Sequence, residues 1–243
     1  MNDADVIVNL AGENIGEGRW TAERKRTLLE SRIESTRALV NAVRKTAMKK
    51  PVFVNASAIG FYGPHGDEAL DETAPAGSGF LADLTSTWEL AARDADGVAR
   101  MVILRFGIVL AREGGALPKM ILPFKMFAGG PIGSGKQWIS WVHRDDVVRM
   151  IEWAIDRPQA RGAYNVTAPE PVTNKVFATE LGKVLGRPSL VPTPGFALRL
   201  ALGEMADALL LSGQKVLPSR ASAEGFQFRY AKLRDALTSI LKG

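Results

Sequence analysis

The chain has 243 residues, of which 46% are hydrophobic and 23% are charged, as expected of a globular protein with one large or two small domains. It contains no cysteine, which excludes disulfides, cysteine nucleophiles and thiolate metal sites. Only His65 and His143, far apart in sequence, could supply imidazole, so we expect no metal site. The net charge of +5 comes without a dense basic block or interleaved aromatic residues, which argues against nucleic-acid binding.

The sequence also argues against export and against a membrane location. Its first residues are polar and acidic, unlike those of a signal peptide. The most apolar predicted helix, residues 196–211, carries Arg199, Glu204 and Asp207, so it is not expected to span a membrane. We therefore expect a cytoplasmic protein.

The first half of the chain alternates between apolar runs and helical patterns. A strand over residues 6–10 ends in Ala11 and Gly12. Thr21 is a suitable cap for a long helix that reaches about Ala47. A second strand is predicted over residues 52–57, a long polar loop over 64–79, a helix over 81–95 and a third strand over 100–111. Three apolar strands separated by helices predict an α/β fold with a parallel sheet.

The second half is less regular. Pro118 is expected to open a short helix that Pro123 limits or kinks. Gly186 and Pro188 are expected to end the helix that begins at Thr173. The remaining predictions are a strand at 137–142, a helix from Asp145 or Asp146 to 156, strands at 163–166 and 190–191, and helices at 196–211 and 230–241. This pattern predicts a main domain at residues 1–190 and a helical C-terminal extension at 191–243.

Five motifs, read in order, resemble one family. They are NLAGENI followed by GRW, NASAIGFYG, LRFGIVLA with GGAL, GGPIGSGKQWISWVHRDD and SGQKVLPSR. The set resembles the atypical short-chain dehydrogenase/reductase group of epimerase family proteins, which are related to nucleotide-sugar epimerases. The resemblance implies a Rossmann-type, doubly wound parallel sheet that binds NADP or NAD, NADP being slightly preferred, with a small substrate subdomain and a helical C-terminal extension.

One part of the family pattern is absent from the sequence. Members normally begin with a strand and a G-x-x-G-x-x-G turn that binds the cofactor pyrophosphate, and this sequence has no such turn. We therefore expect an N-terminally truncated fold. Of the properties that the resemblance implies, cofactor binding is the one that most needs an experimental test. The first strand would then lie at an unpaired edge of the sheet, which favours a homodimer or poor solubility.

The resemblance also indicates site residues. Gly12 would allow the cofactor to approach the backbone next to Ala11, Glu13 would accept a ribose hydroxyl, and Arg19 would face a phosphate. Ile108 and Val109 would line the nicotinamide pocket, although sheet core explains them equally well. Trp138 and Trp141 alternate along a strand, so that one faces the core and the other can face a ligand.

The catalytic residues depart from the family pattern. Ser57 lies where the family places the hydroxyl that binds a substrate carbonyl, and Tyr62 follows it. The family's Tyr and Lys, four residues apart on the next helix, are missing: the candidate pairs are Phe80 with Leu84 and Leu81 with Thr85. Tyr62 or a water would have to supply the proton. Arg105 is expected to form a structural ion pair, and Asp146 to cap a helix.

Two functions follow from these observations. One is an NAD(P)-dependent epimerase or oxidoreductase acting on a small molecule, such as a sugar-nucleotide-like compound. The other is a non-catalytic module for cofactor sensing or protein interaction, built on a dehydrogenase scaffold, which the missing Tyr–Lys pair favours. The sequence names neither the substrate nor the preferred cofactor.

Overall fold

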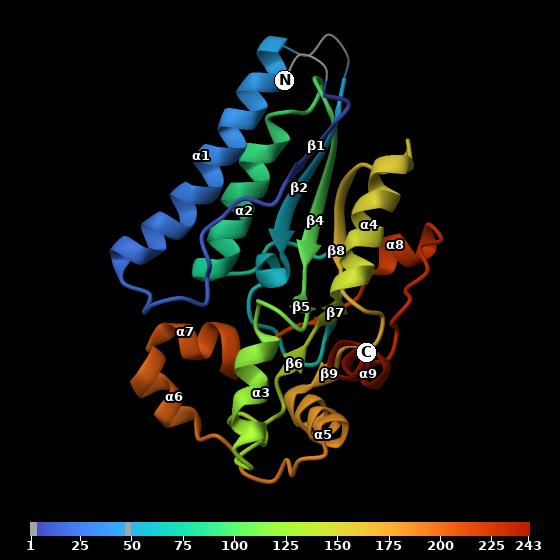
Figure 1. Ribbon diagram of the computed structural model, residues 1–243. Helices are drawn as coiled ribbons and strands as arrows, with labels where there is room; N and C mark the ends of the chain where they lie inside the picture. The colour runs from blue at the N-terminus through green and yellow to red at the C-terminus, as the bar shows by residue number, and fades with distance from the viewer. Residues whose placement is uncertain (1–3, 47–49) are drawn as a thin grey trace.

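A four-stranded parallel sheet forms the centre of the protein in a computed structural model, which describes residues 4–46 and 50–243. The strand order is β1-β2-β4-β8, and Figure 1 shows the strands side by side. Their bounds are Val6–Asn9 for β1, Val52–Ala58 for β2, Arg100–Phe106 for β4 and Gly162–Val166 for β8. Within the described residues β1 pairs with β2 alone, so β1 is an edge strand.

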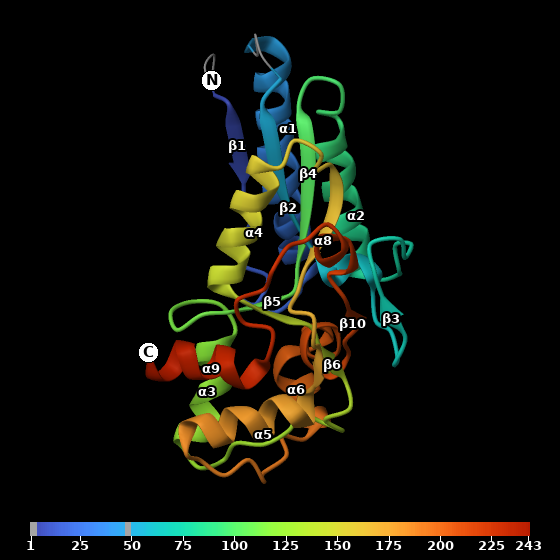
Figure 2. The same ribbon diagram turned by 90° about the vertical axis from the view of Figure 1, so that its right-hand side faces the viewer.

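Helices cover both faces of the sheet, as a doubly wound fold requires. Helices α1 (Ala22–Thr46) and α2 (Phe80–Arg93) lie on one face and α4 (Arg144–Asp156) on the other (Figures 1 and 2). Alternating side chains of each strand serve the two faces: Phe53 and Ile103 pack with α1, whereas Val54 and Leu104 pack with Met150 of α4. The predicted Rossmann-type α/β fold is therefore confirmed.

The predicted cap of the first long helix is also confirmed. Thr21 Oγ1 accepts a hydrogen bond from the backbone N–H of Arg24 at 3.1 Å, which satisfies one of the free donors of the first turn of α1. The predicted end of this helix at Ala47 lies outside the described residues.

The prediction of single strands over 100–111 and 137–142 is wrong. The first run divides at Gly107 into β4 and β5 (Ile108–Leu110), and the second divides at Ser140 into β6 (Trp138–Ile139) and β7 (Trp141–His143). The two breaks touch: a Cβ atom on Gly107 would lie 2.3 Å from the carbonyl oxygen of Ser140. After the breaks, β5 pairs with β7, whereas β6, before the break at Ser140, pairs with β9 (Val172–Thr173).

The C-terminal part differs from its prediction as well. The expected strand at 190–191 does not form, and the expected helix at 196–211 is interrupted at Gly203, whose φ of +63° favours glycine. In its place are α6 (Gly195–Leu202), α7 (Glu204–Ala206) and a π-helical turn, η2 (Asp207–Leu211). The loop predicted at 64–79 contains β3 (Ala69–Leu70), which pairs with β10 (Lys215–Val216).

The remaining helices are η1 (Ile59–Tyr62), α3 (Leu117–Lys125), α5 (Asn174–Leu185), α8 (Ser219–Ala223) and α9 (Leu233–Lys242). Of these, α3, α5 and α9 form a second core, whereas α8 packs in the core of the sheet and η1 in a small cluster with β3 and β10. Buried Leu181 of α5 and Leu237 of α9 belong to one cluster with Trp141, so the C-terminal residues share a core with the middle of the chain. No helix in the described residues has the length and apolar character needed to cross a membrane.

Asp146 does not cap α4, contrary to the prediction. His143 is the N-cap residue, and its Nδ1 accepts from the backbone N–H of Asp145 at 3.0 Å. Asp146 is fully buried and accepts from the backbone N–H groups of Arg229 at 2.8 Å and Tyr230 at 2.9 Å. This carboxylate therefore ties the C-terminal segment to the helix.

Candidate functional site

A cavity of about 500 Å³ opens at the carboxyl ends of β2 and β4, the edge at which open α/β sheets bind ligands. Its lining is mostly apolar. Residues 208–214 form one wall, which is attached by hydrogen bonds from Gln137 Nε2 to the Leu210 carbonyl at 2.7 Å and from Gln214 Nε2 to the Ile59 carbonyl at 2.8 Å. Both the sheet and the C-terminal segment are therefore needed to enclose the cavity.

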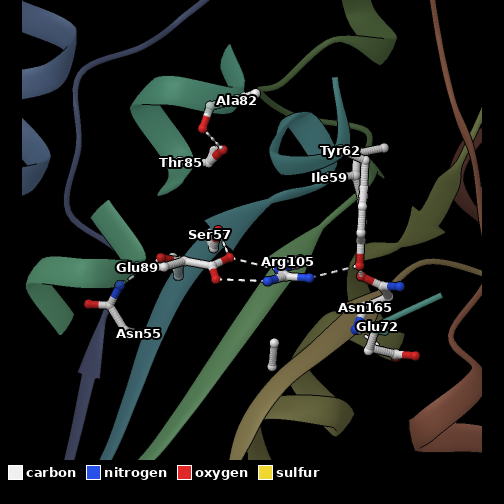
Figure 3. Close-up of polar contacts among 12 residues, drawn as sticks. Asn55, Ser57, Ile59, Tyr62, Glu72, Ala82, Thr85, Glu89, Arg105 and Asn165 are labelled. Carbon is white, nitrogen blue, oxygen red and sulfur yellow. Dashed lines mark hydrogen bonds and ion pairs between the residues drawn. The ribbon is translucent and has the colours of Figure 1, made fainter. Parts of the chain in front are cut away.

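Ser57 lines this cavity at the end of β2, as its predicted role requires. Its hydroxyl lies 2.7 Å from Glu89 Oε1 of α2. Glu89 also receives a bidentate ion pair from Arg105 of β4, with Nε at 2.7 Å from Oε1 and Nη2 at 2.9 Å from Oε2, as Figure 3 shows. The structural ion pair predicted for Arg105 is thus confirmed.

Sheet register explains why these groups meet. Ser57 pairs with Arg105, and Arg105 pairs with Asn165 of β8, so that their side chains lie on one face at neighbouring positions. Burial lowers the pKa of Arg105, but hydrogen bonding and charge attraction from Glu89 outweigh it, and the net shift is upward. The guanidinium remains charged inside the fold.

Tyr62 is brought into the same network but not into the cavity. It is fully buried and does not belong to the cavity lining. Its hydroxyl accepts from Arg105 Nη1 at 2.9 Å and donates to Asn165 Oδ1 at 2.7 Å. Burial raises the pKa of Tyr62 more strongly than Arg105 and Asn165 lower it. Both observations disfavour the predicted role of Tyr62 as proton donor, because such a donor must reach the substrate.

The predicted cofactor turn lies at the rim of the cavity. Leu10 and Ile15 line it, whereas Ala11, Gly12 and Glu13, between them, are exposed. Glu13 pairs with Arg24 at 3.0 Å, and Arg19 is also exposed, donating to the Leu200 carbonyl at 2.9 Å. The side chains of Glu13 and Arg19 therefore both have partners within the chain. Their predicted contacts with a cofactor stay predictions.

Arg32 of α1 is the charged residue that the sequence interpretation missed. It lines the cavity, and a Cβ atom on Gly12 would lie 2.9 Å from its Cζ. The close approach of Gly12 is therefore to this guanidinium. Arg32 follows the buried Leu28 by four residues, one helical turn, a spacing that indicates that it faces the sheet.

One of the two candidate pairs for the missing Tyr and Lys faces the cavity with both of its residues. Leu81 and Thr85 line it, and Thr85 Oγ1 donates to the Leu81 carbonyl at 2.7 Å. Ile108 and Val109 line it, and their contact with a nicotinamide stays a prediction. Of the two tryptophans, Trp138 lines the cavity while Trp141 is buried. Glu89, next to Trp88 in the buried stripe of α2, was missed although an acidic residue there signals a buried polar partner.

His143 lies away from the cavity lining. It is buried and stacks on Tyr230, with ring centroids 3.9 Å apart. Because its Nδ1 accepts a hydrogen bond, its Nε2 carries the proton, and this atom has no partner among the described residues. Its contacts connect the start of α4 to the C-terminal segment.

Comparisons with known proteins agree with this fold. The epimerase family protein SDR39U1 homolog of Arabidopsis thaliana, described as chloroplastic, is 44% identical over 244 residues, which cover 100% of this chain and 70% of that protein. The epimerase family protein YfhF of Bacillus subtilis is 41% identical, over 98% of this chain and 78% of that protein.

Solved structures extend the comparison. Human epimerase family protein SDR39U1, solved with NADPH, has a TM-score of 0.95 at 37% identity, over 100% of this chain and 83% of that chain. UDP-glucuronic acid 4-epimerase from Bacillus cereus, solved with NAD, has a TM-score of 0.76 at 18% identity, over 97% of this chain and 72% of that chain, and shares the fold.

Two family models match the sequence. Residues 193–240 match a domain of unknown function (DUF1731). Residues 1–167, which include β1, β2, β4 and the network around Ser57, match the NAD dependent epimerase/dehydratase family. The chain therefore belongs to the NAD dependent epimerase/dehydratase family, as its motifs indicated.

Proposed function

We propose that the cavity binds NADPH or NADH, with the nicotinamide end near Ile108 and Val109. The cavity lies at the strand ends where this fold class places a dinucleotide, and a relative 37% identical to this chain was solved with NADPH. That relative supports NADPH over NADH as the first cofactor to test.

Arg32 carries this proposal. It is the one formally charged side chain among the described residues that line the cavity. Its guanidinium donates to the carbonyls of Leu28 at 2.9 Å and Glu13 at 3.0 Å and lies 5.2 Å from the Trp88 ring. Burial lowers the pKa of Arg32, against the raising effect of the Glu13 charge. A phosphate or carboxylate of a ligand would supply the counter-ion that a half-buried cation favours.

The residues that line the cavity are compatible with hydride transfer to or from a nicotinamide. They do not include the proton donor that the family usually supplies. A nicotinamide supplies hydride chemistry when bound, and the chain's part is to orient it and to exclude water. Among the described lining residues no Tyr, His, Lys, Asp or Glu side chain is available as acid or base. We expect the proton to come from water or from the substrate itself.

A small molecule is the substrate that we propose, in a reaction of the oxidoreductase or epimerase class. The volume of about 500 Å³ has to hold the nicotinamide end of the cofactor and the substrate together. UDP-glucuronic acid 4-epimerase, whose fold is shared, was solved with NAD, and a sugar-nucleotide-like compound remains one candidate. A cytoplasmic location and the division of the chain at residue 190 stay predictions.

The missing acid and base favour a second candidate, a cofactor sensor without turnover. Neither candidate pair for the family's Tyr and Lys, Phe80 with Leu84 or Leu81 with Thr85, contains a Tyr or a Lys. Both candidates require cofactor binding. They differ in whether the bound nicotinamide is oxidised or reduced by any carbonyl or hydroxyl compound.

Calorimetric titration with NADPH and NADH tests the proposal. We expect saturable binding at one site per chain, weakened about tenfold or more by Arg32→Met, because a charge-assisted contact contributes at least that factor. Arg26→Met, on the exposed side of the same helix, is the matched control and should bind like the unchanged chain. No saturable heat from either cofactor, or equal binding by both variants, would contradict the proposal.

A further inference from the structure

The hydroxyl hydrogen of Ser57 has a defined direction. Its nearest polar partner is the Glu89 carboxylate at 2.7 Å, which also takes two hydrogen bonds from Arg105. A guanidinium is always charged, and a carboxylate that receives it in bidentate fashion is ionised and can only accept. Ser57 must therefore be the donor in its contact with Glu89.

The surroundings hold that arrangement in place. Ser57 and Glu89 are each 2% exposed and Arg105 is 3% exposed. The Arg105 guanidinium also donates to the Tyr62 hydroxyl (Figure 3). It lies 3.5 Å from the centroid of the Phe61 ring. Turning the Ser57 hydrogen toward the cavity would deprive a buried carboxylate oxygen of a hydrogen bond, which is costly.

The oxygen of Ser57 is left with unused acceptor capacity. A serine hydroxyl has one donor and two acceptor positions, and no described group donates to Ser57 Oγ. Because the residue lines the cavity, a ligand is the available source of a donor. This polarity is the reverse of the role expected from the family resemblance, in which the serine donates to a substrate carbonyl.

We propose that Ser57 acts as a hydrogen-bond acceptor toward the ligand, so that the cavity selects an alcohol over the corresponding ketone. The inference rests on the proposed function, since it concerns the second compound bound beside the cofactor. A ketone would present a lone pair to the Ser57 lone pairs, whereas an alcohol supplies the O–H that they lack. Glu89 and Arg105 are the positioning residues, because they fix the direction of the Ser57 hydrogen without touching the ligand.

A matched pair of ring compounds tests this preference. Cyclohexanol and cyclohexanone are each titrated by ligand-observed NMR against the full chain, saturated with the redox-inert 1,4,5,6-tetrahydro form of NADPH. We expect the alcohol to bind about tenfold more tightly or better, because a site with an unpaired buried acceptor rejects an analogue that lacks the donor. Ser57→Ala should bring the ratio close to one.

A hydroxyl outside the network provides the control. Thr87 lies on the exposed side of α2, where its Oγ1 donates to the Asp83 carbonyl, and Thr87→Ala should keep the alcohol preference. The inference would be overturned if the two compounds bound equally, if the ketone bound more tightly, or if neither compound bound. It would also be overturned if the alcohol preference persisted in Ser57→Ala.

A second measurement keeps the inference separate from the proposed function. In the free chain the Ser57 hydroxyl proton should exchange slowly and appear downfield in the proton NMR spectrum, since it is buried against a carboxylate. It should vanish in Ser57→Ala and persist in Thr87→Ala. Failure of the cofactor to bind would refute the proposed function alone, whereas absence of this resonance would refute the polarity assigned to Ser57.

Discussion

The pair formed by Glu89 and Arg105 is the most consequential contact at the residue scale. Both side chains are buried, and together they fix Ser57 and Tyr62. Taking two charges out of water is expensive, and the cost is offset only while each has its partner. The pair is therefore expected to fix the side-chain positions at the end of β2. Substitution of either partner alone is expected to lower the stability of the protein.

We expect Glu89→Ala to lower the free energy of unfolding by about 3–5 kcal/mol, because it leaves the Arg105 charge buried and unpaired. The double variant Glu89→Leu with Arg105→Met should lose less than the sum of the losses in Glu89→Leu alone and Arg105→Met alone. Urea unfolding of the three variants measures this coupling. Additive losses would mean that the two charges do not depend on each other.

At the scale of elements, the break at Gly107 directs the chain from the sheet into the cavity wall. The residue separates β4 from β5, and its backbone lies against the Ser140 carbonyl. Ile108 and Val109 follow directly and line the cavity. A side chain at this crossing would push β4 and β7 apart.

Gly107→Ala should therefore destabilise the protein and weaken cofactor binding together. Overpacking of a tight interior typically costs about 1–3 kcal/mol, and here the added carbon meets backbone atoms. Gly66→Ala is the matched control, because nothing lies within 4 Å of a Cβ atom at Gly66. Thermal unfolding of both variants compares them, and an equal melting temperature would contradict the packing argument.

The contact between His143 at the start of α4 and the C-terminal segment should depend on pH. Burial lowers the pKa of His143. The nearby carboxylates of Asp145 and Asp146 raise this pKa, but by less than burial lowers it. The charges of Arg144 and Arg229 lower the pKa further. The unfolded chain therefore takes up a proton at a higher pH than the folded chain. The stability linked to His143 is complete above its ordinary pKa of about 6.5 and is lost as pH falls through its lower folded value.

His143→Asn isolates this dependence, since asparagine can keep the cap at Asp145 but does not titrate. The variant should be less stable at pH 8 because the stacking on Tyr230 is lost, yet its stability should fall less between pH 7 and pH 5. Denaturant midpoints across this range measure the slope. Parallel slopes for the two chains would show that His143 does not titrate on unfolding.

At the scale of the whole molecule, the edge of β1 that has no partner strand among the described residues is where we expect association. Val6 is 37% exposed and Val8 40%, while the alternating Ile7 faces the core. Among the described residues this edge has no partner strand beyond β2. Unpaired apolar edges bind other strands.

We expect concentration-dependent self-association, with a dimer as its first product, and we expect Val8→Lys to suppress it. Light scattering after size exclusion distinguishes the species. Val176→Lys, at an exposed position on α5, controls for the added charge. A monodisperse monomer of the unchanged chain over the full concentration range would contradict this expectation.

Those features of the fold and the site that depend on short stretches of sequence could be predicted. Apolar runs that end in small residues located β2 and the position of Ser57, and family motifs predicted the cavity wall at Ile108 and Val109. The sequence could not predict the breaks at Gly107 and Ser140, because these arise where two distant segments cross. The Glu89 partner of Ser57 was missed for the same reason: sheet register and the packing of α2, rather than sequence spacing, bring it within reach.

The central claim is that the cavity beside Ser57 holds a nicotinamide ring, and energy transfer from tryptophan to NADPH tests it most directly. Trp88 and Trp138 line the cavity, whereas Trp141 and Trp153 do not. Titration with NADPH should give saturable quenching of tryptophan emission with sensitised emission from the cofactor, and Trp138→Phe should reduce this signal more than Trp153→Phe. A signal that does not saturate, or that falls as much in Trp153→Phe as in Trp138→Phe, would contradict the account.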